Sequence, residues 1–289
     1  MRQKYKYQFR KGSKKEICPN CKKKTFTPYV YSSDIKTAVD VMKYGICDRI
    51  NSCQYILYPK SADSDSEWKQ PIETYQPPQP DFIPYEIVEA TFGRFETNTF
   101  FIWLVKLFGE NRANELQKTY SIGTAKDNGT IFWQKDLEGN FRTGKVMYYQ
   151  SNGKRNKKRN SWYVHNEIKK DYELHQVLYG ENLIKENPVK KVALCESEKT
   201  AILMSVFEPQ YTWIASGGAN MLNEYRLLRL PKLDFVSADE GEFEKWRQQT
   251  NIFNNRKMDI RVEQAVQIGM LENGADILDL ILLEKINNN

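Results

Sequence analysis

Residues 189–203 read VKKVALCESEKTAIL, and this stretch decides the fold that the sequence predicts. The apolar run at 192–195 is typical of a buried β-strand, and it ends in Glu196 and Glu198. The helix-forming segment at 199–203 follows directly. A strand that ends in carboxylates and leads at once into a helix indicates a βα unit whose acids lie at one edge of a sheet.

The same plan repeats downstream. YTWIASGGAN (211–220) reads as a strand that breaks at Gly217 and Gly218, and LDFVSADEGEFEKW (233–246) reads as a strand, an acidic turn and a helix. RKMDIRVEQ (256–264) offers another strand and ADILDLILLEKI (275–286) a final helix. Strands that alternate with helices predict an α/β fold with a parallel sheet.

Because the carboxyl ends of parallel strands share one edge, we expect Glu196, Asp239 and Glu240 to converge there. Carboxylates brought together repel one another, and Mg²⁺ that bridges them to phosphate oxygens relieves the repulsion. Gly217 and Gly218 would allow a close backbone approach at the same edge. The alternative, ordinary solvated acids at the edge of a sheet, stays open.

Four of the five cysteines lie in the first 60 residues. The Cys18-x2-Cys21 knuckle is followed by Cys47-x5-Cys53, which supplies four thiolates for tetrahedral Zn²⁺. KTFTPYVYS, between the pairs, is strand-like, as a zinc ribbon requires. The wide second knuckle has no explanation in the sequence, and Cys195 is expected to be a small core residue.

The middle of the chain supplies further elements. Residues 61–84 are rich in Ser, Asp, Gln and Pro and predict a linker. Residues 97–120 read as two helices, capped by Thr97 or Asn98 and separated at Gly109. TIFWQKDLEGNFRTGKVMYY (130–149) reads as a hairpin, and a short helix is expected to end near Gly180.

The net charge of +6 is concentrated in two places, the first 24 residues and GKRNKKRN at 153–160. Such runs are often only solvated surface. Aromatic residues are interleaved with both runs, which favours a polyanion such as nucleic acid as the partner. Clustered cations bind phosphates with the release of counterions, and bases stack on exposed rings. No apolar run reaches the ~20 residues that a bilayer requires, and no signal peptide opens the chain, so a cytoplasmic location without membrane partners is expected.

CESEKTA, SGGAN and ADEG, in that order, resemble the Toprim domain of bacterial primases, topoisomerases and some nucleases. The resemblance implies that Glu196 is a general acid or base and that Asp239 holds Mg²⁺ or Mn²⁺. The second aspartate of the family pattern falls on Gly241, so Glu240 would have to substitute or the metal site is weakened. Asp276 and Asp279 lie where many Toprim proteins carry a late acidic motif.

The resemblance extends upstream. YSIGTAKDNGTIFWQKDLEGNFRTGKVMYY is similar to the core of bacterial replicative primases, and the order of parts resembles primase-like proteins of mobile elements and phages. The expected organisation is a zinc ribbon (1–60), the linker (61–84), a basic mixed α+β primase-core-like subdomain (85–188) and a Rossmann-like Toprim domain (189–289).

This resemblance implies a DNA primase-like nucleotidyltransferase in DNA replication, with single-stranded DNA and nucleoside triphosphates as ligands and a separate helicase as partner. The residues expected to contact nucleic acid or nucleotide are Arg142, Lys145, Lys154, Arg155, Lys199, Gly217 and Gly218. Two alternatives remain: a zinc-ribbon DNA-binding protein that has lost its chemistry, and a Toprim nuclease.

Overall fold

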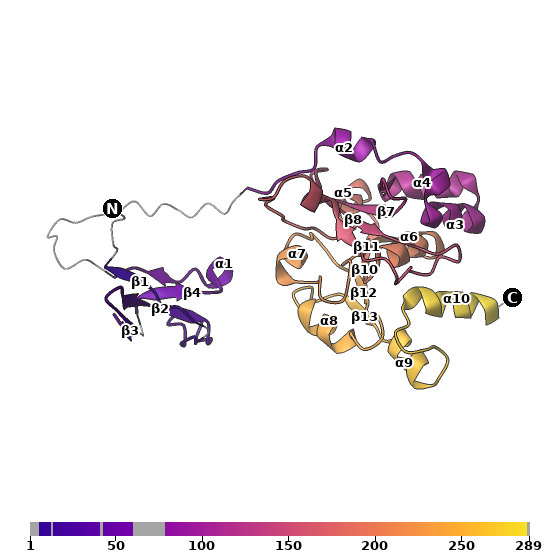
Figure 1. The fold of residues 1–289 in the computed structure, drawn as a ribbon. Coiled ribbons are helices and arrows are strands. Elements are labelled where there is room, and N and C mark those ends of the chain that lie inside the picture. The colour runs from indigo at the N-terminus through magenta and orange to yellow at the C-terminus, as the bar shows by residue number, and fades with distance from the viewer. Residues whose placement is uncertain (1–5, 13, 41–42, 60–78, 288–289) are drawn as a thin grey trace. The chain divides into compact units, whose positions relative to one another are not determined.

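The computed structural model of the chain describes residues 6–12, 14–40, 43–59 and 79–287. The chain forms two compact units, Met1–Tyr75 (unit 1) and Gln76–Asn289 (unit 2), and each is described by itself (Figure 1). Most of the expected linker lies outside the described residues. The last residues of the expected linker, 79–84, are described and belong to unit 2. Asp81 pairs there with Lys169 at 2.7 Å, and Ile83 is buried.

Unit 1 is built on an antiparallel sheet in the order β1-β2-β4-β5, with β3 beside β2. Its elements are β1 (Tyr7–Phe9), β2 (Phe26–Tyr31), β3 (Asp34–Ala38), β4 (Gly45–Cys47), α1 (Ile50–Cys53) and β5 (Ile56–Leu57). The strand expected in KTFTPYVYS is β2. Gly45 allows β4 to lie close to β2, because a Cβ there would be 2.4 Å from the carbonyl oxygen of Thr27.

The first half of unit 2 combines helices with a four-stranded antiparallel sheet in the order β6-β7-β8-β9. Its elements are α2 (Tyr85–Glu89), α3 (Thr99–Phe108), α4 (Glu110–Thr119), β6 (Ile122–Thr124), β7 (Thr130–Lys135), β8 (Phe141–Met147), β9 (Trp162–Tyr163) and the 3₁₀-helices Phe95–Thr97 and Val164–Glu167. Asn98 caps α3 by accepting a hydrogen bond from the Phe101 N–H at 3.2 Å, and Gly109 separates α3 from α4. Both helices and the hairpin were expected from the sequence.

The second half of unit 2 contains a parallel sheet in the order β11-β10-β12-β13. Its elements are α5 (Asn182–Glu186), β10 (Lys191–Cys195), α6 (Glu198–Phe207), β11 (Tyr211–Ala215), α7 (Glu224–Leu228), β12 (Phe235–Ser237), α8 (Phe243–Gln249), β13 (Lys257–Asp259), α9 (Arg261–Gln267) and α10 (Ile277–Asn287).

Both faces of the parallel sheet are buried. Ala193 and Cys195 of β10 face a core that includes side chains of α3, α4, α6, α9 and α10. Val192 and Leu194, the alternate residues, face a second core with side chains of α5, α7 and α8. This alternation explains why the strand is apolar throughout, since neither face meets water. Cys195 is buried as expected.

Two local expectations differ from the structure. No helix ends at Gly180: residues 172–178 are irregular, and Gly180, with φ of +79°, precedes α5 instead. The strand expected within 256–264 covers only β13, and α9 follows it at once.

The chain is thus an α/β protein in which a four-cysteine ribbon precedes a unit with one antiparallel and one parallel sheet. None of the helices in the described part of the chain combines the length and apolar character that crossing a bilayer requires.

Candidate functional site

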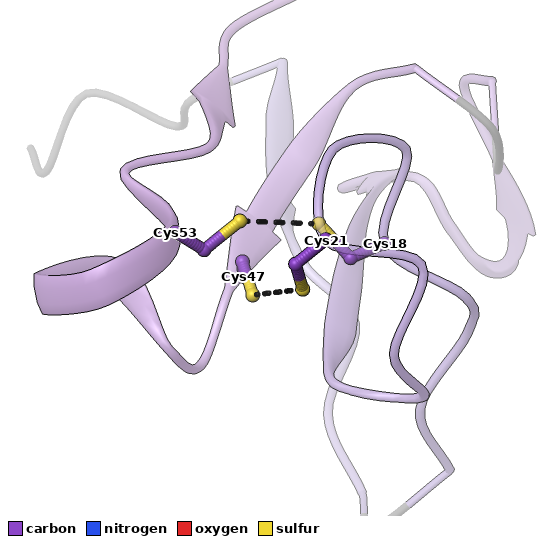
Figure 2. A group of neighbouring side chains, drawn as sticks. All are labelled: Cys18, Cys21, Cys47 and Cys53. Carbon is purple, nitrogen blue, oxygen red and sulfur yellow. Dashed lines mark hydrogen bonds between the residues drawn. The ribbon is translucent and has the colours of Figure 1, made fainter. Parts of the chain in front are cut away.

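The four cysteines of unit 1 form one cluster, in which all sulfur atoms lie within 4.8 Å of one another. The Sγ atoms of Cys18 and Cys53 are 3.6 Å apart, and those of Cys21 and Cys47 are 3.9 Å apart (Figure 2). A tetrahedral site with Zn–S bonds of about 2.3 Å has S···S edges of about 3.8 Å. The cluster therefore has the donor set and the spacing of a structural zinc site.

The short helix α1 accounts for the wide second knuckle. Cys47 ends β4, and one turn of helix over Ile50–Cys53 returns the chain so that Cys53 meets Cys18. Asn20 holds this return by donating to the carbonyl oxygen of Cys53 at 2.8 Å. The five-residue spacing is thus long enough to include a helical turn.

The acids of unit 2 lie at the carboxyl edge of the parallel sheet. In β10 and β12, Leu194 lies beside Val236, so Glu196 and Asp239 leave neighbouring strands at nearly the same level. Burial, reinforced by the charge of Glu196 and other nearby carboxylates, raises the pKa of Asp239 to about 8. Burial also raises the pKa of Glu196, and Glu242 is the charge that adds most to this shift. Glu196 and Asp239 are therefore electrostatic neighbours.

A third element contributes to this edge. Asp276 and Asp279, at the start of α10, both raise the pKa of Asp239. They cap the helix reciprocally: each carboxylate accepts the backbone N–H of the other residue, at 3.0 and 3.1 Å. Thr200 of α6 donates to Asp276 at 2.5 Å, which ties α10 to the helix that follows Glu196.

Glu240 and Glu242 take different positions. The Glu240 carboxylate accepts the N–H of Gly274 at 3.0 Å, so it holds the loop before α10. The charge of Glu242 raises the pKa of Glu196 and that of Asp239. The Glu242 carboxylate is paired with Lys245 at 2.7 Å. Glu242 is therefore the carboxylate of this loop whose charge reaches both Glu196 and Asp239, and the sequence analysis did not select it.

Lys145 joins the antiparallel sheet to this edge. Its Nζ lies 3.0 and 3.2 Å from the two carboxylate oxygens of Glu198 and donates to the carbonyl oxygen of Gly217 at 2.7 Å. Both side chains are largely buried, with 12% of Lys145 and 2% of Glu198 exposed. Gly217, with φ of +84°, forms the turn that brings its carbonyl to Lys145. Lys145 is thus engaged inside the protein.

The other predicted contacts are divided between interior and surface. Arg142 is buried and paired with Asp136 at 2.7 Å, so its guanidinium lies inside the protein. Lys154 and Arg155 are exposed. Burial and Asp276 raise the pKa of Asp279, whereas Lys199 and Lys154 lower it. Lys154 and Lys199 therefore lie within electrostatic reach of the acidic edge.

Two members of the site were missed by the sequence analysis. Glu198 was seen only as a second acid after the strand, and the lysine that pairs with it is 53 residues away in the chain. Glu242 lies three residues from Lys245, a spacing typical of an ion pair on a helix, so that pattern was available in the sequence.

Among the described residues, the cysteines are the one group of three or more potential ligands whose donor atoms all lie within 4.8 Å of one another. The acids of unit 2 therefore do not form a closed cage. Mg²⁺ seldom uses one, since it keeps several waters and binds through one or two carboxylates and the phosphates of a substrate. The carboxylates of Glu196, Asp239 and Glu242 could supply the one or two protein ligands that a hydrated Mg²⁺ requires.

Comparisons with known proteins agree with this division of the chain. Residues 98–237 match a family described as a domain of unknown function, DUF6371, and residues 3–68 match a putative zinc β-ribbon finger. No curated protein matches the sequence.

Two solved structures show a distant likeness. The primase fragment of the bacteriophage T7 primase-helicase protein is 13% identical, with a TM-score of 0.41 over 96% of this chain and 100% of that chain. A DNA primase domain from Pseudomonas aeruginosa is 10% identical, with a TM-score of 0.31 over 63% of this chain and 65% of that chain.

Proposed function

We propose that the protein is a DNA primase-like nucleotidyltransferase that acts on single-stranded DNA with nucleoside triphosphates. The observation that supports this most directly is the convergence of carboxylates from β10, β12, α8 and α10 on one edge. Burial and the charges of the neighbouring carboxylates raise the pKa of Asp239 to about 8. A site with this excess of negative charge favours a divalent cation.

Glu196 and Asp239 are the proposed ligands of Mg²⁺ or Mn²⁺, with Glu242 as the additional carboxylate. When bound, the cation would neutralise charge on the triphosphate and on the attacking hydroxyl. Asp239 must lose its proton for this role. Lys154 and Lys199, which lie within electrostatic reach of Asp279, are placed to attract phosphates toward the same edge. A separate helicase and a role in mobile-element or phage replication belong to this proposal as well.

The experiment is template-directed nucleotide incorporation on single-stranded DNA with Mg²⁺. Glu196→Gln and Asp239→Asn should each lower incorporation by at least two orders of magnitude, the scale of losing a positioned charge in a reaction site. Glu110→Gln, at the exposed start of α4, is the matched control and should keep full activity. Equal synthesis by all four proteins would exclude this edge as the reaction site.

A second candidate is a nucleic-acid-binding protein without chemistry. Gly241 replaces the second aspartate of the Toprim pattern, and the carboxylate of Glu240 is engaged with Gly274. This candidate predicts DNA affinity that is independent of Mg²⁺ and of Glu196→Gln, together with no incorporation by the wild type. A nuclease, the third alternative, would instead cleave DNA with Mg²⁺ in the absence of nucleotides.

A further inference from the structure

Lys245 of α8 places an ammonium group beside the acidic edge of unit 2. Its Nζ donates to the carboxylate of Glu242 at 2.7 Å, to the carbonyl oxygen of Ala219 at 3.1 Å and to the side-chain oxygen of Asn220 at 3.0 Å. An ammonium group has three N–H donors, and all three are used here. Lys245 is therefore held in one position by its own helix and by the loop that follows β11.

This arrangement differs from an ordinary ion pair on the surface of a helix. Arg247, on the same helix, pairs with Glu244 at 2.7 Å, and the two side chains are 53% and 58% exposed. The corresponding values for Lys245 and Glu242 are 39% and 27%. The Arg247 pair stays within one turn of α8, whereas Lys245 connects α8 to residues 25 and 26 positions away in the chain.

The charge of Lys245 reaches the proposed metal ligands. Burial raises the pKa of Glu196, and the charge of Glu242 adds to that shift. Lys145 and Lys245 act on the pKa of Glu196 in the opposite direction. Lys145 is bound to Glu198 inside the protein. Of these two cations, Lys245 is thus the one whose direct partner is a proposed metal ligand.

The loop after β11 connects Lys245 with Glu196 in a second way. The backbone N–H of Ala219 lowers the pKa of Glu196, and the carbonyl oxygen of the same residue accepts the hydrogen bond from Lys245. Lys245 and Glu196 therefore lie on either side of Ala219. The ammonium group is in this way part of the acidic edge, although it belongs to a helix surface in the sequence pattern.

A carboxylate that already holds an ammonium group is a weaker ligand for a metal ion, because two cations at one carboxylate repel each other. We propose that Lys245 is a resident counter-ion of the acidic edge, which a divalent cation must displace from Glu242 in order to bind. The inference rests on the proposed role of Glu196, Asp239 and Glu242 as ligands of Mg²⁺ or Mn²⁺. It adds to that role a lysine that lowers the affinity of the site for the ion.

The test is titration of the full, zinc-loaded chain with Mn²⁺, in which electron paramagnetic resonance measures the free ion. Lys245→Met removes the ammonium group and should tighten Mn²⁺ binding by about 5- to 20-fold, a range that allows for solvent screening at a partly exposed site. Lys245→Arg keeps the charge and should stay within about twofold of the wild type. Arg247→Met makes the same change of net charge on the same helix and is the matched control, with an expected change below about twofold. Lys245→Gln, which keeps an N–H donor without the charge, replaces Lys245→Met if circular dichroism shows that variant to be unfolded.

Unchanged or weaker Mn²⁺ binding by the neutral Lys245 variant would overturn the proposal. The proposed function would survive that result if the wild type binds Mn²⁺ and Glu196→Gln binds it more weakly. Equal tightening in Arg247→Met would also overturn the proposal, since net charge would then be the cause. Absence of Mn²⁺ binding by every protein would refute both the counter-ion and the proposed metal site. Tighter binding by Lys245→Met together with absent nucleotide incorporation by the wild type would support the counter-ion and refute the proposed reaction.

Discussion

Replacement of Lys145 by methionine should destabilise unit 2 strongly. The ammonium group contacts both carboxylate oxygens of Glu198 and the carbonyl oxygen of Gly217 at distances of 2.7–3.2 Å. Methionine is similar in length, so it fills the space but leaves the carboxylate without its cation. Since Glu198 is only 2% exposed, water cannot replace the lost partner.

The expected magnitude follows from this burial. Removal of one partner from a buried ion pair typically costs about 3–5 kcal/mol, a large part of a stability of about 5–15 kcal/mol. The double variant Lys145→Met/Glu198→Gln has no unpaired charge, so it should be more stable than the sum of the single changes predicts. We expect a coupling free energy of at least about 2 kcal/mol.

Urea denaturation followed by tryptophan fluorescence is the assay. Five of the six tryptophans lie in unit 2, at positions 103, 133, 162, 213 and 246, so the signal reports on that unit. The matched control is Arg112→Met, which removes a cation from an exposed pair with Glu115. It should change the free energy of unfolding by less than about 1 kcal/mol.

A cost below about 1 kcal/mol for Lys145→Met would refute the reasoning, as would additivity in the double variant. Either result would mean that the ammonium group of Lys145 does not compensate the buried charge of Glu198. A large cost with strong coupling would show that Lys145 is held inside the protein by its pair with Glu198.

Three further predictions concern other parts of the chain. The pKa of Asp239 is about 8 in the folded protein against an ordinary 3.8, so the folded state retains a proton that the unfolded state loses. The free energy of unfolding should therefore fall between about pH 4 and pH 8, by at most about 1.4 kcal/mol per pH unit, and Asp239→Asn should remove that slope in urea titrations without divalent cations. Cys47→Ser should abolish the one zinc per chain, measured by atomic emission, and unfold unit 1 by circular dichroism, since structural zinc contributes about 10–16 kcal/mol. Asn98→Ala should lower the free energy of unfolding of unit 2 by at least about 1–2 kcal/mol in the same urea assay, because it removes the cap on the Phe101 N–H and the buried hydrogen bonds with Gly123, Thr124 and Thr130; an unchanged midpoint would show that these bonds contribute nothing.

Local sequence signals predicted much of the framework. Asn98 and Gly109 bound α3 because capping and left-handed turns depend on a few adjacent residues. The hairpin of β7 and β8 and the zinc cysteines were predictable for the same reason. Gly180 was misread because a glycine with positive φ is compatible with the end of a helix and equally with the turn before one.

The members of the acidic edge were only partly predictable. Glu196 and Asp239 could be selected because each lies within two residues of the end of a strand, and neighbouring parallel strands share an edge. Glu240 and Glu242 are equally acidic in the sequence. Their difference arises from the loop at Gly274, which engages the first and leaves the second beside Glu196.

By itself, the sequence determined the order of strands and helices, the four thiols of the ribbon and the placing of carboxylates after strands. These features follow from side-chain periodicity and short spacings, which act over a few residues. Only the tertiary structure decided which charged side chains form buried ion pairs inside the protein. The pairing of Lys145 with Glu198 joins residues 53 positions apart, and the burial of Arg142 against Asp136 depends on the packed hairpin. A lysine on a strand has the same local pattern whether it binds phosphate or a buried carboxylate, because burial and distance across the chain exist only after folding.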